Sequence, residues 1–303
     1  MHELNCDQFV FSFSGKHAPV LSVQSGDQVI IRTQDCFSGQ IQSDDDLVTS
    51  MDYSRINPAT GPIYVKEAEP GDILKVEILH ISIGEKGVIT TMPDIGTLIH
   101  QSAIRTKTVQ IKEEKTIVFS DQIQFACSPM IGVIGVAPSE GEVACGHPGV
   151  HGGNLDSSCI GEGAAVYLPV FVPGALFGLG DLHASMGDGE MCGTGIEING
   201  EVQVRLTLLK GEGKPLPTPI VETADAWYII SSHHEILKAI QAASEITQQL
   251  VAERLNIGMT DAYLLMGAVG DIRLSQCCKP CPVETVARVK MPKLIGMESL
   301  LGA

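Results

Sequence analysis

Two similar turn-and-strand units constrain the fold of this chain more than any other feature of its sequence. Residues 28–33 and 73–78 are partly alternating runs rich in β-branched side chains, and a Gly-Asp turn precedes each of them. Such alternation is typical of strands that bury one face and expose the other. The repeated unit predicts a β-sandwich or a barrel-like fold.

More strands are expected along the first two thirds of the chain, at residues 88–91, 108–111, 116–119, 166–172 and 176–183. Asn199 and Gly200 lie between two further apolar runs, 194–198 and 201–209. Because Asn-Gly favours the type I′ turn that joins adjacent antiparallel strands, these runs predict a β-hairpin.

The pattern becomes helical after residue 231. Ser232 and Glu235 have the spacing of a capping box, and apolar side chains then recur at helical spacing to about Leu255. A second helix is expected to begin after Thr260 and to end near 267–270, and residues 271–275 return to strand. The fold class that follows is mainly β with an α+β C-terminal portion.

A proline-rich stretch, 214–219, suggests a joint between these two parts, although a surface loop within one domain fits it equally well. We therefore expect a β-rich domain over 1–213 that carries most of the site residues. An α+β region over 214–303 is expected to pack against it.

The charge balance limits the partners of the chain. The 303 residues contain 36 acidic and 20 basic side chains, a net charge of -16, which opposes binding to nucleic-acid phosphates or to an anionic membrane surface. The long uncharged stretch 164–180 is interrupted by proline and glycine, so no membrane span is expected. The start of the chain lacks the pattern of a secretory signal, and nine cysteines suit reduced thiols, so the expected location is the cytoplasm.

Ionisable side chains are densest in residues 180–190. If 176–183 is a strand, Asp181 and His183 project from the same face, and a glycine-rich turn could return Asp188 or Glu190 to their side. A mixed set of carboxylates and imidazole suits zinc or another divalent cation. The alternative is that Asp188 only serves the turn and that His183 has no ligand role.

Two other segments offer candidate ligands. A glycine-rich loop carries His151, Asn154 and Asp156, and the last two lie at positions i and i+2, which suits a site-forming loop or, alternatively, a turn without a ligand. Asp35 follows the strand at 28–33 and could either reach a metal or cap the following loop.

Cysteine chemistry gives a rival hypothesis. Glu190 lies two residues before Cys192, as a nucleophilic cysteine with a nearby base would require, but no neighbouring lysine completes such a site. Cys278 and Cys281 form a C-x-x-C pair without a second pair, which favours incidental thiols in a loop.

Taken together, several segments resemble the acetamidase/formamidase family. They are the stretches Asn-Pro-Ala-Thr-Gly-Pro-Ile-Tyr-Val (57–65), Ala-Glu-Pro-Gly-Asp (68–72), His-Gly-Gly-Asn-Leu-Asp (151–156), Tyr-Leu-Pro-Val-Phe-Val-Pro-Gly-Ala-Leu-Phe (167–177), Gly-Asp-Leu-His-Ala (180–184) and Gly-Asp-Gly-Glu (187–190). The resemblance implies a β-rich fold with an α+β portion and the hydrolysis of short aliphatic amides, formamide or acetamide, to the carboxylate and ammonia.

The expected mechanism uses a divalent cation, zinc first and calcium second, to polarise the amide carbonyl and to lower the pKa of a bound water. Glu190 is the expected general base, with Asp188 as a second catalytic carboxylate. The expected metal ligands are Asp181, His183, Asp35 and Asp156, and Asn154 and His151 are expected to contact the amide substrate.

Two alternatives to the metal-dependent amidase stay open. One is an amidase with Cys192 as its nucleophile, and the other is a non-enzymatic β-sandwich binding module stabilised by calcium. A homo-oligomer is expected, because a β-rich subunit gains from covering its strand edges.

Overall fold

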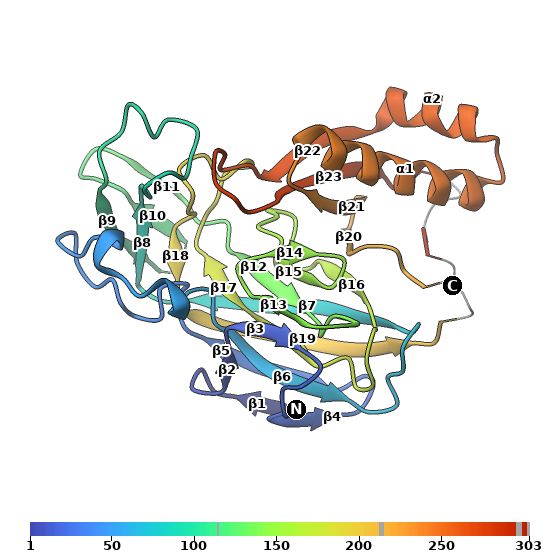
Figure 1. The fold of residues 1–303 in the computed structure, drawn as a ribbon, viewed down its shortest axis with the longest axis horizontal. Coiled ribbons are helices and arrows are strands. Elements are labelled where there is room, and N and C mark those ends of the chain that lie inside the picture. Colours follow the sequence, from blue (N-terminus) through green and yellow to red (C-terminus); the bar gives the residue numbers. More distant parts are fainter. Residues whose placement is uncertain (114, 212–214, 295–298, 302–303) are drawn as a thin grey trace.

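The computed structural model describes residues 1–303 except 114, 212–214, 295–298 and 302–303. Most of the regular structure in the described residues is β-strand, and the two α-helices lie near the C-terminal end (Figure 1). The fold class expected from the sequence, mainly β with an α+β C-terminal portion, is confirmed.

The first large sheet contains nine strands of the described chain. In spatial order they are β1 (His2–Leu4), β5 (Gln28–Thr33), β19 (Gly200–Leu209), β7 (Ile73–Ile83), β16 (Ala165–Pro169), β20 (Ile220–Glu222), β21 (Ala226–His233), β23 (Thr285–Pro292) and β22 (Asp271–Gln276). Burial along β5 and β7 largely alternates with period two, as their sequences predict.

The second large sheet contains twelve strands of the described chain. Its main path is β11 (Gln124–Ala126), β10 (Thr116–Val118), β9 (Thr106–Lys112), β8 (Lys86–Thr90), β18 (Glu197–Ile198), β17 (Phe177–His183), β12 (Met130–Gly135), β15 (Gly152–Asn154) and β14 (Pro148–Gly149). Strand β6 (Ala59–Val65) joins this sheet through β17 and pairs with β2 (Phe9–Val10) and β4 (Leu21–Val23). A small sheet pairs β3 (Ser12–Ser14) with β13 (Glu142–Ala144), and two short 3-10 helices are η1 (Val48–Ser50) and η2 (Tyr53–Arg55).

The main hydrophobic core joins the two large sheets. Its buried side chains include Val76 and Val204 from the first sheet and Ile134 and Leu179 from the second. Burying an aliphatic side chain of this size stabilises the fold by about 1.5–3 kcal/mol. The two sheets are therefore held together by a shared apolar interior, as in a β-sandwich.

The helices cover the C-terminal part of the first sheet. Helix α1 (Ile236–Leu255) packs on β21 and β23, and α2 (Met259–Val269) lies beside it (Figure 1). Trp227 and Ile229 on β21 form a second apolar cluster with Ala243 and Val251 of α1 and Met266 of α2. No helix in the described residues is long and apolar enough to span a membrane.

Two local predictions are wrong. The expected hairpin at Asn199-Gly200 does not form, because β18 pairs with β8 and β17 in one sheet whereas β19 pairs with β5 and β7 in the other. Neither residue has the positive φ that a type I′ turn requires. The expected capping box is also absent, because β21 continues to His233 and α1 begins at Ile236 with Glu235 as its N-cap.

The strand topology brings the C-terminal part of the chain to the second sheet. Gln276 at the end of β22 forms a parallel bridge with Gly189, in the turn that follows β17. Strands β20 to β23 also continue the sheet that contains β1, β5, β7 and β19. The domain boundary expected at 213 and 214 falls outside the described residues and stays a prediction.

Candidate active site

Strand β17 carries the first two residues of a buried polar cluster. Asp181 and His183 are 2% and 1% exposed, and the carboxylate oxygen Asp181 Oδ1 lies 3.5 Å from His183 Nε2. Their positions at i and i+2 put both side chains on one face of the strand. The sequence pattern therefore brings these two residues together as expected.

Three more carboxylates complete this acidic cluster. Glu197 lies opposite His183 across the β17–β18 pair, with Glu197 Oε2 at 3.0 Å from His183 Nε2. Asp156 Oδ1 lies 3.8 Å from the same nitrogen. Ligand atoms of Asp156, His183 and Glu190 also lie within 4.8 Å of one another. All five side chains are buried.

The backbone is strained at several of these acids. Asp156, Asp181 and Glu190 have φ angles of 38°, 56° and 46°, in the left-handed region that residues with a Cβ rarely adopt. Each residue in this conformation lowers the stability of the fold by about 1–3 kcal/mol. Backbone strain of this kind is most common at functional sites. The positions of the three carboxylates are therefore maintained against a local energetic cost.

Two glycines provide the space that the cluster needs. A Cβ on Gly132 of β12 would lie 2.6 Å from Asp156 Oδ1 and 2.7 Å from Asp181 Oδ2. A Cβ on Gly195 would lie 2.7 Å from His183 Nδ1. Any larger residue at either position would displace a side chain of the cluster.

Burial and mutual repulsion raise the pKa values of the carboxyl groups. Burial raises the pKa of Asp156 to about 8, with Asp181 adding to the effect. Burial also raises the pKa of Glu197 to about 7, although His183 opposes the rise, and it raises the pKa of Glu190 well above its usual value. Burial alone would lower the pKa of His183, but Glu197 and Asp181 outweigh it and raise that pKa.

The donor atoms of this cluster fit a divalent cation. Asp156 Oδ1, Asp181 Oδ1 and Glu197 Oε2 are buried, and apart from their contacts with His183 Nε2 they have no hydrogen-bond partner among the described residues. No lysine or arginine among those residues lines the cavity beside them. Ligands of a tetrahedral zinc ion lie about 3.3 Å from one another, close to the spacing between His183 Nε2 and the three carboxylate oxygens. A bound cation would therefore satisfy both the charge and the unpaired oxygens.

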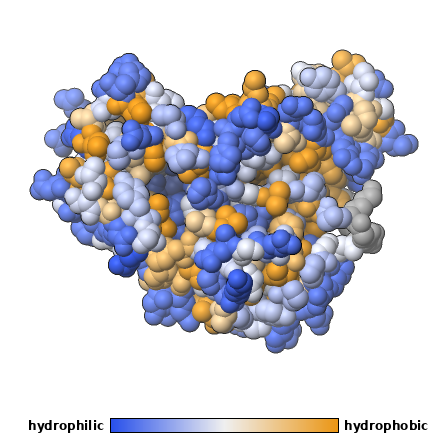
Figure 2. Space-filling model, in the orientation of Figure 1, coloured by the Kyte–Doolittle hydropathy of each residue, from blue (hydrophilic) through white to orange (hydrophobic). Residues whose placement is uncertain are grey.

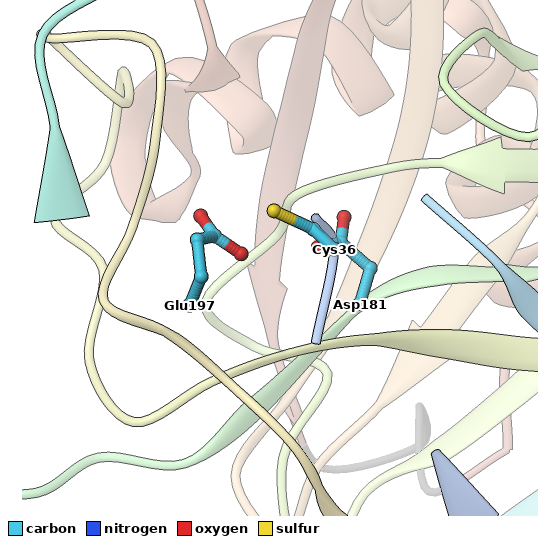
Figure 3. Close-up of side chains that lie close together, drawn as sticks. All are labelled: Cys36, Asp181 and Glu197. Carbon is cyan, nitrogen blue, oxygen red and sulfur yellow. The ribbon is translucent and has the colours of Figure 1, made fainter. Parts of the chain in front are cut away.

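The thiol of Cys36 lies next to two carboxylates of the cluster. Cys36 Sγ and one oxygen each of Asp181 and Glu197 lie within 4.8 Å of one another, and Figure 3 shows the thiol and the Glu197 carboxylate facing each other. Burial raises the pKa of Cys36 well above its usual value, and the Glu197 charge adds to the rise. The thiol is thus protonated at neutral pH unless a cation binds it.

The cluster lies at a small cavity of about 110 Å³. Apolar side chains of Phe37, Met51, Met92 and Ile95 form part of its wall. Met92 and Ile95 also line a larger outer cavity of about 570 Å³. A small chamber that contains the acidic cluster therefore lies next to a larger one.

Three amide side chains line the inner cavity. Asn57 Nδ2 donates hydrogen bonds to Asp181 Oδ2 at 3.1 Å and to Asn154 Oδ1 at 3.4 Å. Gln276 Nε2 donates to Asp156 Oδ2 at 2.6 Å and to Glu190 Oε2 at 3.3 Å. These bonds fix the orientation of the carboxylates.

Two other predicted site residues, Asp35 and Asp188, have partners outside the cluster. Asp35 Oδ1 accepts hydrogen bonds from the backbone of Phe37 and Gly39, as a loop cap does. Asp188 pairs with the buried Arg288, whose Nη2 lies 2.7 Å from Asp188 Oδ2. Neither carboxylate lines the inner cavity.

His151 also lies outside the residues that line the inner cavity. Its ring is buried against the ring of Phe13, with ring centroids 5.4 Å apart. Burial lowers the pKa of His151 to about 4, so the ring is neutral at physiological pH. A substrate-binding role for His151 stays a prediction.

The three cysteines considered from the sequence lie at different cavities. Cys192 lines only the outer cavity, where its thiol lies 3.5 Å from the carbonyl oxygen of Thr194. Cys278 and Cys281 line the inner cavity, and their sulfur atoms lie 3.2 Å apart. The C-x-x-C pair lies in a loop, as expected, and this loop forms part of the wall of the inner cavity.

Sequence reasoning missed Glu197, Cys36, Asn57 and Gln276. Glu197 did carry a signal, because it is a charged residue between two isoleucines in a predicted strand. Gln276 directly follows another predicted strand, but a single amide at a strand end points to no particular site. Only the tertiary fold brings these residues to Asp181 and His183.

Strained, buried carboxylates with raised pKa values, grouped with an imidazole at a small cavity, are features that enzyme active sites share, and they make this cluster the candidate active site. The chain belongs to the acetamidase/formamidase family, whose model matches residues 15–145 and 140–267. The resemblance identified from the sequence motifs is thus confirmed.

Individual relatives agree with this assignment. The chain is similar to the crystal structure of an acetamidase from Bacillus halodurans, with 39% identity, a TM-score of 0.93 and coverage of 99% of this chain and 100% of that one. A recombinant predicted acetamidase/formamidase from Thermoanaerobacter tengcongensis is 42% identical, with a TM-score of 0.92 and coverage of 97% and 96%. A formamidase of Methylophilus methylotrophus is 27% identical over 272 residues, 67% of each protein. The chain spans 61% to 67% of the length of the curated relatives that it matches.

Proposed function

We propose that this protein hydrolyses short aliphatic amides, such as formamide and acetamide, to the carboxylate and ammonia. The observation that carries this proposal is the group of four buried carboxylates and one imidazole at a cavity without a lysine or arginine among its described lining residues. The cavity of about 110 Å³ suits a substrate of a few non-hydrogen atoms. The names of the relatives, formamidase and acetamidase, describe substrates of that size.

Asp156, Asp181, His183 and Glu197 are the residues that would hold a divalent cation in this mechanism. Zinc is the first choice because the set combines imidazole with carboxylates, and calcium, which prefers oxygen ligands alone, is the second. When bound, the cation would polarise the amide carbonyl and lower the pKa of water. Asp35 has its backbone partners and is left out of this set.

Glu190 is the general base in the proposed mechanism. Its carboxylate is buried beside Asp156 and His183, and burial raises its pKa, which makes the ionised form a stronger proton acceptor. Glu190 takes a proton from the attacking water and passes it to the departing ammonia. Asn154, held by Asn57, orients the substrate from the cavity wall. Asp188 supports the turn that carries Glu190 through its pair with Arg288.

A panel of amides tests the proposed substrate class. We expect ammonia release from formamide, acetamide or propionamide with a kcat/KM at least about 100-fold above that for benzamide, because a bulky ring does not fit the inner cavity. Ammonia is measured with a coupled assay, and heat-inactivated protein is the control. A lack of ammonia release from every amide in the panel would instead support the calcium-stabilised binding module.

The cysteine mechanism makes a separate prediction. Because Cys192 lies outside the lining of the inner cavity, Cys192→Ala is expected to retain ammonia release within about threefold of the parent. Mass spectrometry should also find no acyl-enzyme. Loss of activity with a trapped acyl group on Cys192 in the parent would establish the nucleophile and refute the mechanism above.

Location and assembly belong to the same proposal. All nine cysteines are free thiols, which supports a reducing compartment such as the cytoplasm. On the face shown in Figure 2, hydrophobic side chains occur in separate groups among hydrophilic ones. Exposed apolar residues such as Leu98 and Met191 would gain from a subunit contact, which supports the expected homo-oligomer.

A further inference from the structure

Gln276 connects the C-terminal part of the fold to the turn that carries Glu190. It ends β22, and its backbone forms a bridge with Gly189. On either side of it, Gly189 N donates to Ser275 O at 3.0 Å and Cys277 N donates to Gly189 O at 3.0 Å. The Gln276 side chain is 4% exposed and lines the inner cavity. Its position is therefore fixed by the same backbone contacts that fix the Glu190 turn.

Hydrogen bonds determine which way the Gln276 amide faces. When Asp156 and Glu190 are ionised, as their proposed ligand and base roles require, their oxygens only accept hydrogen bonds, so the amide nitrogen faces Asp156 Oδ2 at 2.6 Å and Glu190 Oε2 at 3.3 Å. The reverse orientation would place an oxygen against these two acceptors. The remaining atom, Gln276 Oε1, is buried and has no hydrogen-bond partner among the described residues.

A buried acceptor without a partner is energetically unfavourable. Because Gln276 is one of the residues that line the inner cavity, a bound substrate is the group that could supply the missing partner. A primary amide carries two N–H donors on its nitrogen, whereas the corresponding ester carries none at that position. Gln276 also contacts Glu190, the residue that passes a proton to the same nitrogen in the proposed mechanism.

We propose that Gln276 Oε1 accepts a hydrogen bond from the nitrogen of the substrate amide, which makes Gln276 a residue that selects amides over esters. This inference rests on the proposed amide hydrolysis. Gln276 Nε2 donates hydrogen bonds to the carboxylates of Asp156 and Glu190. In the proposed complex, Gln276 Oε1 accepts a hydrogen bond from the leaving nitrogen and keeps that nitrogen close to the Glu190 base. An ester would leave this buried oxygen unpaired, and a site that hydrogen-bonds a substrate group discriminates strongly against an analogue without it.

The test compares hydrolysis of acetamide and methyl acetate by Gln276→Leu and Gln276→Met. Both variants should lower the ratio of kcat/KM for acetamide to kcat/KM for methyl acetate by about tenfold to a hundredfold. Asn57→Leu is the matched control, because it also removes an amide, here a half-buried one, that donates to a carboxylate of the cluster. Asn57→Leu should lower kcat/KM for acetamide and for methyl acetate by the same factor, because a general disturbance of the carboxylates affects both reactions. The ratio of the two kcat/KM values should therefore stay unchanged.

A binding measurement separates this inference from the proposed function. In the slow Glu190→Gln background, Gln276→Leu should weaken acetamide binding by about tenfold in calorimetry and leave methyl acetate binding unchanged. A ratio within about twofold of the parent in both variants, with unchanged acetamide binding, would overturn the role of Gln276. Failure of the parent protein to release ammonia from acetamide would count against the proposed function, while the binding comparison would still decide the role of Gln276.

Discussion

His183→Ala is expected to abolish binding of the divalent cation and to lower amide hydrolysis by about a thousandfold or more. His183 Nε2 is the nitrogen around which oxygens of Glu197, Asp181 and Asp156 lie at 3.0, 3.5 and 3.8 Å. Deleting a ligand removes metal affinity itself, and a catalytic cation supplies several kcal/mol of stabilisation to the transition state. Metal content by elemental analysis and ammonia release measured on the same preparations test both parts.

A matched control is His151→Phe, which also removes a buried imidazole but keeps an aromatic ring against Phe13. This variant should retain its metal, because His151 lies outside the lining of the inner cavity. Prolonged chelation of the parent protein should reproduce the loss seen in His183→Ala, and addition of zinc should reverse it. A stoichiometric metal in purified His183→Ala, or full activity after chelation, would show that the ligand assignment is wrong.

The local part of the site could be predicted because strand geometry is periodic. Asp181 and His183 are two residues apart in an apolar strand, and Asn154 and Asp156 have the same spacing in a glycine-rich segment, so each pair shares a side. Glu197 and Gln276 could not be paired with them in advance. Glu197 reaches the cavity through the pairing of β18 with β17, and Gln276 reaches it through a bridge with Gly189, which lies far earlier in the sequence.

The wrong local predictions have a common physical cause. Asn199-Gly200 has favourable turn chemistry, but the strands on either side obtain more hydrogen bonds and burial from two different sheets than from each other. Ser232 likewise could cap a helix, but it is used to extend β21 along β23. Short-range preferences of about 1 kcal/mol are overridden when a longer strand pairing competes with them.

Asp35 and Asp188 show why a carboxylate beside a turn is ambiguous in sequence. The same side chain can bind a metal, accept hydrogen bonds from the loop backbone or pair with a distant cation. Asp35 accepts backbone hydrogen bonds from its own loop. Asp188 pairs with Arg288, a residue 100 positions later in the chain and only 2% exposed. Which of these partners is available depends on the fold and not on the local spacing.

Glu190→Gln is expected to bind the cation and the substrate as the parent does, but to hydrolyse amides about 100- to 10,000-fold more slowly. Glutamine is nearly isosteric with glutamate, but it cannot take the proton of the attacking water. The other candidate ligands, Asp156, Asp181, His183 and Glu197, are unchanged, so metal content should equal that of the parent. Ammonia release, metal content and acetamide binding are measured together on this variant and on His183→Ala.

The two variants distinguish a base from a ligand because their metal contents should differ. Ligand atoms of Glu190 lie within 4.8 Å of those of Asp156 and His183, a distance that is compatible with either role. Turnover of Glu190→Gln at the parental rate would mean that Glu190 is not the base. Loss of metal as complete as in His183→Ala would make Glu190 a ligand, and the proton would then have to pass through another buried carboxylate, of which Asp156 is the one that shares Gln276 with Glu190.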